Sequence, residues 1–172
     1  MSIVREWGST PADRALDFAC DRFLDRPDDV LFRAVAVDAA PATVFRWLCQ
    51  MRVAPYSYDW IDNWGRESPR TLTPGLDDLA VGQRVLIFDL VAFEAPHHLT
   101  LRLRDGQAVF GDVAITYRVV PQANGTSRLV AKLLVRYPPG VVGWLSRWWL
   151  PAGDLVMMRK QLLNLKSLAE GG

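Results

Sequence analysis

The sequence has few cysteines and no long apolar run. Its 172 residues include only Cys20 and Cys49, each on a predicted helix, and we expect two reduced thiols rather than a disulfide. No stretch approaches the roughly 18 apolar residues of a membrane span, and residues 1–10 lack the apolar run of a signal peptide. These absences favour a soluble, cytoplasmic protein without stable membrane insertion.

Charge excess and catalytic signatures are also missing. The formal net charge is +1 and no basic patch stands out, which argues against a nucleic-acid partner. There is no glycine-rich phosphate loop, no GxSxG, no HExxH and no CxxC motif. We therefore expect no cofactor, no metal and no catalytic constellation. The length favours one domain with a substantial core.

The first third of the chain predicts two helices around a strand. Thr10 is a suitable cap and Pro11 a suitable first helical residue, so a helix is predicted from Thr10 to the break at Pro27. Residues 30–37 predict a strand. A second helix is predicted over residues 41–51, with one apolar arc and with Arg46 and Gln50 on the opposite, wet side.

Alternating residues then predict four consecutive strands, over residues 84–94, 98–104, 109–120 and 128–137. Turn signals separate them at residues 95–97, 105–106 and 124–125. This order predicts an antiparallel meander with one apolar and one polar face, which packs on one side only. Residues 53–82 are irregular, with a short helix or turn expected at 58–63 and a short strand at 70–73.

A long amphipathic helix is predicted to end the chain. Pro151 is placed at its start, and it runs to about residue 168. Its apolar arc includes Leu155, Met158, Leu162 and Leu165, and it contains one polar residue, Gln161. A one-sided sheet must cover its apolar face, and this helix is long enough to do so. The predicted fold class is α+β, a curved sheet closed against the terminal helix with an apolar pocket between them.

Four segments resemble the START-like, helix-grip superfamily, which includes polyketide cyclases, lipid-transfer domains and birch-pollen-allergen-like proteins. They are VAVDAAPATVFRWLCQM (35–51), YSYDWIDN (56–63), LAVGQRV (79–85) and MMRKQLL (157–163). The likeness covers roughly residues 30–169. It implies a START-like domain over residues 30–172, preceded by a helical extension over residues 1–29. The bacterial subgroup that it resembles is described only as polyketide cyclase/dehydrase-like.

The resemblance implies a pocket for a small hydrophobic molecule, such as a lipid, a polyketide or an aromatic metabolite. We expect a binding protein rather than an enzyme. A cyclase, aromatase or dehydratase is the alternative, and an interaction or oligomerisation module is a second one. Fold alone does not choose among them.

Two groups of residues are candidates for ligand binding. The first is the polar and aromatic cluster in the irregular segment, where binding residues often lie on loops; the alternative is a structural plug. It contains Tyr56, Tyr58, Asp59, Trp60 and Trp64. The second is a set predicted to face inward, namely Tyr117, Met157 and Gln161, together with Tyr137. Its alternative is that these side chains find their hydrogen-bond partners within the core.

Three further features have competing interpretations. His97 and His98 suit a surface turn better than a metal or catalytic site, because adjacent strand residues point to opposite faces. Asp89 is expected to face outward, toward Arg102 and Arg104, rather than to act as a buried acid. Trp144, Trp148 and Trp149 are expected to pack under the sheet edge, with an exposed patch for a membrane or a partner as the alternative.

Overall fold

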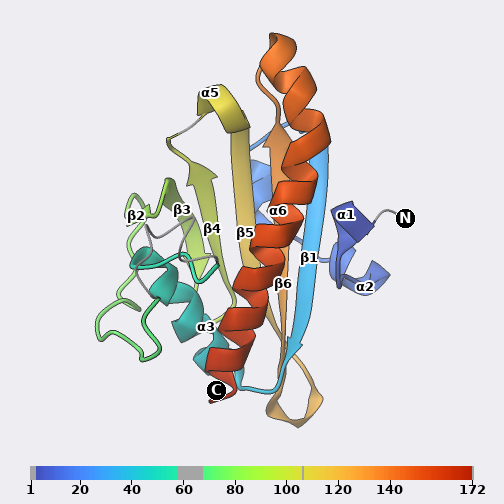
Figure 1. The fold of residues 1–172 in the computed structure, drawn as a ribbon. Coiled ribbons are helices and arrows are strands. Elements are labelled where there is room, and N and C mark those ends of the chain that lie inside the picture. Colours follow the sequence, from blue (N-terminus) through green and yellow to red (C-terminus); the bar gives the residue numbers. More distant parts are fainter. Residues whose placement is uncertain (1–2, 58–67, 106, 172) are drawn as a thin grey trace.

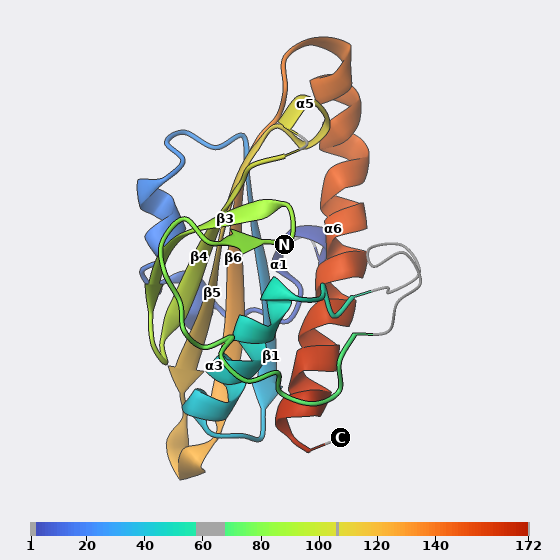
Figure 2. The same ribbon diagram turned by 90° about the vertical axis from the view of Figure 1, so that its left-hand side faces the viewer.

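The computed structural model describes residues 3–57, 68–105 and 107–171 (Figure 1). A curved antiparallel sheet forms one layer, and the long helix α6 (Gly140–Ala169) crosses its inner face. Helix α3 (Pro41–Cys49) and the short turn η2 (Gln50–Arg52) lie on the same side of the sheet, next to α6 (Figure 2). The α+β prediction, a curved sheet against a terminal helix, is confirmed.

Within the described residues the sheet has six strands, in the order β1-β6-β5-β4-β3-β2, and every neighbouring pair is antiparallel. They are β1 (Asp29–Val37), β2 (Arg84–Val85), β3 (Phe88–Glu94), β4 (His98–Leu103), β5 (Asp112–Pro121) and β6 (Ser127–Arg136). The predicted meander is therefore confirmed as β3 to β6. The early strand β1 pairs with β6, so the chain's first and last strands are neighbours.

Two connections differ from the predicted ones. The single strand expected over residues 84–94 is a tight hairpin of β2 and β3, because Leu86 adopts a left-handed φ of 58° and reverses the chain. The turn expected at residues 105–106 is longer and includes helix α5 (Gln107–Phe110), so β5 begins at Asp112. Gly111 is required after α5, since a Cβ there would lie 2.0 Å from the Arg136 carbonyl oxygen.

The turn between β5 and β6 agrees with its prediction. It contains the short turn η3 (Ala123–Gly125), in which Asn124 has a φ of 65° and Gly125 a φ of 75°. Asparagine and glycine tolerate this left-handed backbone better than other residues.

The terminal helix starts about three turns earlier than predicted. It begins at Gly140, and Pro151, which was expected to start it, lies inside it. Proline has no N–H to donate to the carbonyl four residues earlier in the helix. The Pro151 carbonyl itself accepts a 3.4 Å bond from the guanidinium of Arg33 in β1. Met158, Leu162 and Leu165 are buried against the sheet as expected. No helix in the described ranges combines the length and apolarity needed to cross a bilayer.

The expected packing of the three C-terminal tryptophans is wrong. Trp144, Trp148 and Trp149 are 61%, 75% and 47% exposed, on the first turns of α6. Because the helix already begins at Gly140, this segment extends past the body of the sheet instead of folding under its edge (Figure 1).

The outer face of the sheet is also buried, so the prediction of a sheet packed on one side is wrong. Residues 18–24 cross this face (Figure 2) and bury Phe18, Cys20 and Leu24 against it. Outward-facing Val130 and Leu134 of β6 are 0% and 2% exposed there. Charged residues share this face with them, which made the face look polar. Cys20 and Cys49 are both buried and both free, as expected.

The N-terminal helix is shorter than predicted. The segment contains α1 (Ile3–Glu6), α2 (Pro11–Arg14) and the turn η1 (Ala19–Arg22). The predicted cap at Thr10 and the first position of Pro11 are confirmed, but the helix ends at Arg14. Phe18 is extended and packs edge-to-face on Phe32 of β1. Tertiary contacts thus override the helical pattern, and the predicted domain boundary at residue 30 stays a prediction.

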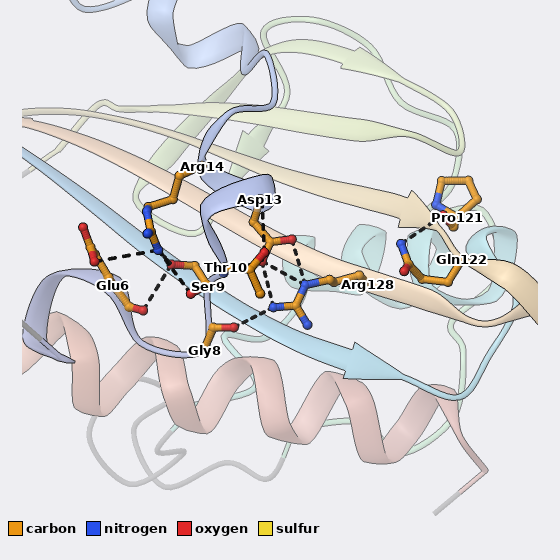
Figure 3. Close-up of polar contacts among 9 residues, drawn as sticks. All are labelled: Glu6, Gly8, Ser9, Thr10, Asp13, Arg14, Pro121, Gln122 and Arg128. Atoms are coloured by element: carbon orange, nitrogen blue, oxygen red, sulfur yellow. Dashed lines mark hydrogen bonds and ion pairs between the residues drawn. The ribbon is translucent and has the colours of Figure 1, made fainter. Parts of the chain in front are cut away.

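Several ion pairs join this N-terminal segment to the sheet, and the most buried of them is that between Asp13 and Arg128. Arg128 of β6 donates from Nε to Asp13 at 2.7 Å and from Nη2 to the Gly8 carbonyl at 2.6 Å (Figure 3). Asp13 also accepts from the Thr10 backbone at 2.6 Å. Burial raises the pKa of Asp13, but these bonds outweigh it and hold that pKa below its ordinary value.

Helix α3 and the turn after it pack more of their surface than predicted. Gln50, expected on the wet side, is 2% exposed. Its amide oxygen accepts a 2.8 Å bond from the Thr73 backbone, and its amide nitrogen donates to the Thr73 carbonyl at 3.3 Å. The described residues 70–73 do not form the expected strand, and this side chain satisfies the backbone there instead.

Replacing Arg128 tests the N-terminal anchor. Arg128→Ala leaves the buried Asp13 carboxylate with fewer partners and is expected to lower the free energy of unfolding by about 2 kcal/mol. Because the folded pKa of Asp13 is lowered, this contribution is present at neutral pH and is lost as the pH falls below the ordinary value of 3.8. Urea unfolding of both proteins at neutral and at acid pH measures it. The matched control is Arg104→Ala, whose ion pair with Asp89 is exposed and is expected to change stability by less than about 1 kcal/mol.

Candidate functional site

A cavity of about 330 Å³ lies between α6 and the inner face of the sheet. Its described walls come from β4, β5, β6, the β2–β3 turn, α6 and the segment that follows α3. The apolar lining is Met51, Pro55, Val85, Leu86, Ile87, Phe88, Leu101, Ile115, Leu133, Met157 and Met158, and the polar lining is Ser57, Tyr117, Asp154 and Gln161. A mostly apolar wall with a few polar groups is typical of a small-molecule site.

Helix α6 supplies two of the four polar side chains that line this cavity, Asp154 and Gln161. Asp154, Met157, Met158 and Gln161 follow the spacing of one helical face, so they all reach the sheet side. The Gln161 amide oxygen accepts a 2.7 Å bond from the Tyr117 hydroxyl, and its nitrogen donates to the Pro55 carbonyl at 2.7 Å. These two bonds tie α6 to β5 and to the segment after α3.

The segment before the undescribed residues 58–67 is also bonded to α6. Ser57 donates to the Met157 carbonyl at 3.1 Å, and Asn164 donates to the Tyr56 carbonyl at 2.9 Å. The Tyr56 ring lies edge-on to Trp47 of α3, 6.1 Å between centroids. The chain at this end of the cavity is therefore held by the helix that forms its wall.

A buried ion pair spans the cavity's edge. Arg33 lies in the middle of β1 with a fully buried side chain, and its Nη2 contacts Asp154 Oδ2 at 2.8 Å. Arg33 also donates to the Phe32 carbonyl at 2.9 Å, while its Nε has no partner in the described structure. Asp154 keeps 12% of its side chain exposed, and no bond to its second carboxylate oxygen is found among the described residues.

Burial disfavours the charged form of both members of this pair. Burial raises the pKa of Asp154 to about 6, although Arg33 acts in the opposite direction. Burial likewise lowers the pKa of Arg33, against the attraction of Asp154. Burial also raises the pKa of Tyr117, so this hydroxyl remains a proton donor. The cavity thus presents a carboxylate that burial makes a weaker acid than an ordinary aspartate.

The overall arrangement is found in several solved structures. No family model matches the sequence, and no curated protein matches it. Three solved structures align over most of this chain. The di-domain ARO/CYC StfQ from the steffimycin biosynthetic pathway is 14% identical with a TM-score of 0.54, over 83% of this chain and 50% of that one.

The other two are similar to the same degree. DynU16, a putative protein in the dynemicin biosynthetic locus, is 18% identical with a TM-score of 0.52, over 82% of this chain and 48% of that one. A protein of Thermus thermophilus is 15% identical with a TM-score of 0.52, over 83% and 97%. The chain has the helix-grip fold. The predicted likeness to the START-like superfamily is confirmed at the level of the fold, since identities this low show nothing finer.

The cavity between α6 and the sheet is lined by three of the residues predicted to bind a ligand, namely Tyr117, Met157 and Gln161. Tyr117 and Gln161 bond to each other, so the predicted alternative of an internally bonded core describes that contact. Tyr56 is buried beside Trp47 and does not line the cavity. The remaining predicted residues, Tyr58, Asp59, Trp60 and Trp64, lie outside the described residues. Ligand binding by any of them stays a prediction.

The other candidate site residues lie away from the cavity between α6 and the sheet. Tyr137 is buried as predicted, but its hydroxyl bonds to Asp29 at 3.2 Å, outside the cavity. Asp89 faces outward and pairs with Arg104 at 3.2 Å, as predicted, while Arg102 pairs with Asp112.

His97 lies in the predicted turn between β3 and β4, and His98 is the first residue of β4. Both line a separate, mostly polar groove of about 890 Å³ on the outer face of the sheet. Within the described ranges, no cluster of three or more potential ligands could hold a metal ion.

Arg33 and Asp154 were not among the predicted site residues, although a signal for each exists. Arg33 alternates in phase with Leu31, Val35 and Val37, which all face the inner core. Asp154 lies four residues before Met158, on the buried stripe of the terminal helix. A charged residue that falls on the apolar face of a strand or helix is expected to be buried. Two such residues of opposite sign are expected to form an ion pair, because an unpaired buried charge is costly.

Removing the arginine tests the buried pair. Arg33→Met leaves Asp154 buried without its cation and is expected to cost about 3–5 kcal/mol of unfolding free energy where Asp154 is ionised. Without Arg33 the folded pKa of Asp154 rises further above its ordinary 3.8, so the variant gains stability on acidification and loses it as the pH rises. Urea unfolding at about pH 5 and at about pH 8 measures this difference.

The double variant Arg33→Met/Asp154→Leu is the matched control. It replaces both charges by apolar groups and is expected to be at least as stable as the wild type, with little dependence on pH from this site. A single variant that is equally destabilised at both pH values would contradict the assignment of an uncompensated Asp154 charge.

Proposed function

We propose that this chain binds a small, mainly apolar molecule in the cavity between α6 and the sheet. The observation that carries the proposal is a cavity of about 330 Å³ with a mostly apolar wall and one carboxylate, Asp154, of which one oxygen contacts Arg33. Small-molecule sites span about 300–1,000 Å³, so this volume suits a ligand of roughly two fused rings. The helix-grip fold supports the proposal without naming the ligand.

The polar lining favours a ligand with a hydrogen-bond donor. One oxygen of Asp154 is bonded to Arg33, and the other has no partner among the described residues. With a pKa of about 6, Asp154 is mostly ionised at neutral pH and only accepts hydrogen bonds. A hydroxyl or amine on the ligand satisfies this oxygen, whereas a carboxylate would be repelled by it.

Probe molecules of matched size test this proposal. At neutral pH 2-naphthol, which carries a donor, is expected to bind about tenfold more tightly than 2-methylnaphthalene, since a hydrogen bond to a charged group contributes about 1.5–3 kcal/mol. 2-Naphthoate is expected not to bind. Isothermal titration calorimetry measures the three affinities. Equal affinities for 2-naphthol and 2-methylnaphthalene would remove the role of Asp154.

Two neighbouring residues of α6 provide the control. Met157 lines the cavity, whereas Val156 is 53% exposed. Met157→Trp fills the cavity and is expected to abolish binding of both probes, and Val156→Trp adds the same side chain to the surface and leaves binding intact. If Met157→Trp still binds 2-methylnaphthalene, the probes bind elsewhere and the proposed cavity site is wrong.

An enzyme of the cyclase or dehydratase type is the second candidate. It is favoured by Asp154, a carboxylate that lines the cavity with a pKa of about 6, close to the operating pH that suits a general base. Such chemistry begins when a base takes a proton from a carbon beside a carbonyl group. In this proposal the C–H electron pair becomes the enolate, and Asp154 holds the proton until it returns to carbon or exchanges with solvent.

Deuterium exchange isolates this step. In D₂O the protein is expected to accelerate exchange at the carbon next to the carbonyl of 1-tetralone, followed by proton NMR. Asp154→Asn is expected to reduce the acceleration by about 100-fold or more while still binding 2-methylnaphthalene. Asp89→Asn, which changes a carboxylate on the outer face, is the control. No acceleration over buffer by the wild type would dismiss the enzyme and leave the binding proposal standing.

A further inference from the structure

The outer side of α6 carries a second apolar surface, which the helix-grip packing leaves uncovered. Its large side chains are Val141, Val142, Trp144, Leu145, Trp148, Trp149 and Val156, each between 47% and 75% exposed. Val109 of α5 adds to it at 48% exposure, beside Phe110, which packs edge-to-face on Trp149. We call these residues the α6 outer face. Such a contiguous apolar surface is typical of a binding surface.

The geometry of the helix gathers these residues. At 100° per residue, Val141, Trp144, Leu145 and Trp148 fall within about a third of the helix circumference, opposite the buried Ser146 and Leu150. Helix α6 is therefore apolar on two sides, one toward the sheet and one toward solvent. Its first turns extend past the body of the sheet (Figure 1), so the tryptophans lie at one end of the molecule.

The exposed charged residues of α6 itself are all positive. Arg147, Arg159 and Lys160 are exposed on α6, and its one acidic residue, Asp154, is turned inward to Arg33. Arg147 pairs with Asp28 at 2.9 Å, and Arg159 lies over the Trp7 ring at 5.7 Å. Within the described chain, Arg159 and Lys160 have no carboxylate within ion-pair distance. The surface thus combines tryptophan and aliphatic side chains with two cations, Arg159 and Lys160, that pair with no carboxylate of the described residues.

We propose that the α6 outer face docks this protein onto an anionic lipid surface. Tryptophan has an apolar ring and a polar N–H and is enriched at the membrane–water interface, and basic side chains flanking an apolar helical face are attracted to anionic headgroups. The helix lies in the interface and does not cross the bilayer. A second copy of this surface fits less well, because it brings no carboxylate for Arg159 and Lys160.

Sedimentation with lipid vesicles tests the proposal. The protein is expected to bind vesicles of phosphatidylcholine mixed with phosphatidylglycerol and to bind pure phosphatidylcholine weakly. Its tryptophan fluorescence is expected to shift to the blue on binding. Trp144→Ser/Trp148→Ser is expected to abolish both signals, and thermal unfolding checks that this variant folds.

Charge reversal separates the electrostatic part. Arg159→Glu/Lys160→Glu is expected to weaken binding at least about tenfold, since each cation near an anionic surface contributes about 1 kcal/mol, a factor of about five. Arg46→Glu/Arg70→Glu makes the same change of net charge at exposed positions outside α6 and is expected to bind far better than the first pair.

Three results would overturn the proposal. One is no sedimentation with either vesicle. Another is equal weakening by the two charge-reversal pairs, which would indicate a nonspecific effect of net charge. The third is a dimer by light scattering that Trp148→Ser dissociates and that does not bind lipid, which would assign the α6 outer face to a second copy of this chain. The proposal does not depend on the cavity ligand, since Met157→Trp is expected to leave vesicle binding unchanged.

Discussion

The ion pair between Arg33 and Asp154 joins the first strand of the sheet to the terminal helix across the inner face. Burying two charges costs several kcal/mol, which the attraction between them offsets only in part. The raised pKa of Asp154 and the lowered pKa of Arg33 both express this cost. The pair is one of the contacts between α6 and β1, and it keeps a carboxylate at the edge of the cavity. The polar character of the candidate site follows from it.

The need to cover both apolar faces of the sheet explains most of the remaining structure. Both faces of the central strands carry apolar side chains, so α6 and α3 cover the inner face and residues 18–24 cover the outer one. A helix does not follow a curved sheet along its whole length, and the space left near Tyr117 and Met157 is the cavity. The same helix continues past the sheet, where Trp144 and Trp148 stay exposed and Phe110 covers only part of Trp149. One element therefore contributes to both proposed sites.

The sequence pattern predicted the elements whose conformation depends on residues that are close together in the chain. Alternation of side chains predicted β4, β5 and β6, and the Asn124–Gly125 turn has the left-handed backbone that these residues favour. The prediction was wrong where a distant partner decides the conformation. Pro151 looked like the start of a helix because the contacts that hold it within α6 are not visible locally. Gln50 looked solvent-exposed because its partner is the backbone of Thr73, 23 residues away.

The candidate site shows the same division. The sequence by itself determined the α+β class, since strand alternation and the apolar stripe of the last helix require a sheet packed on that helix, and its resemblance to the helix-grip superfamily implied the finer fold. It also placed Tyr117, Met157 and Gln161 on the inward faces of their elements. Only the tertiary structure decided that Arg33 meets Asp154, because 121 residues separate them. The alternation of a strand and the period of a helix show that each residue is buried, but not which distant charge it contacts. The tertiary structure likewise decided that Trp144 and Trp148 are exposed, because the extent of α6 beyond the sheet depends on where the sheet ends.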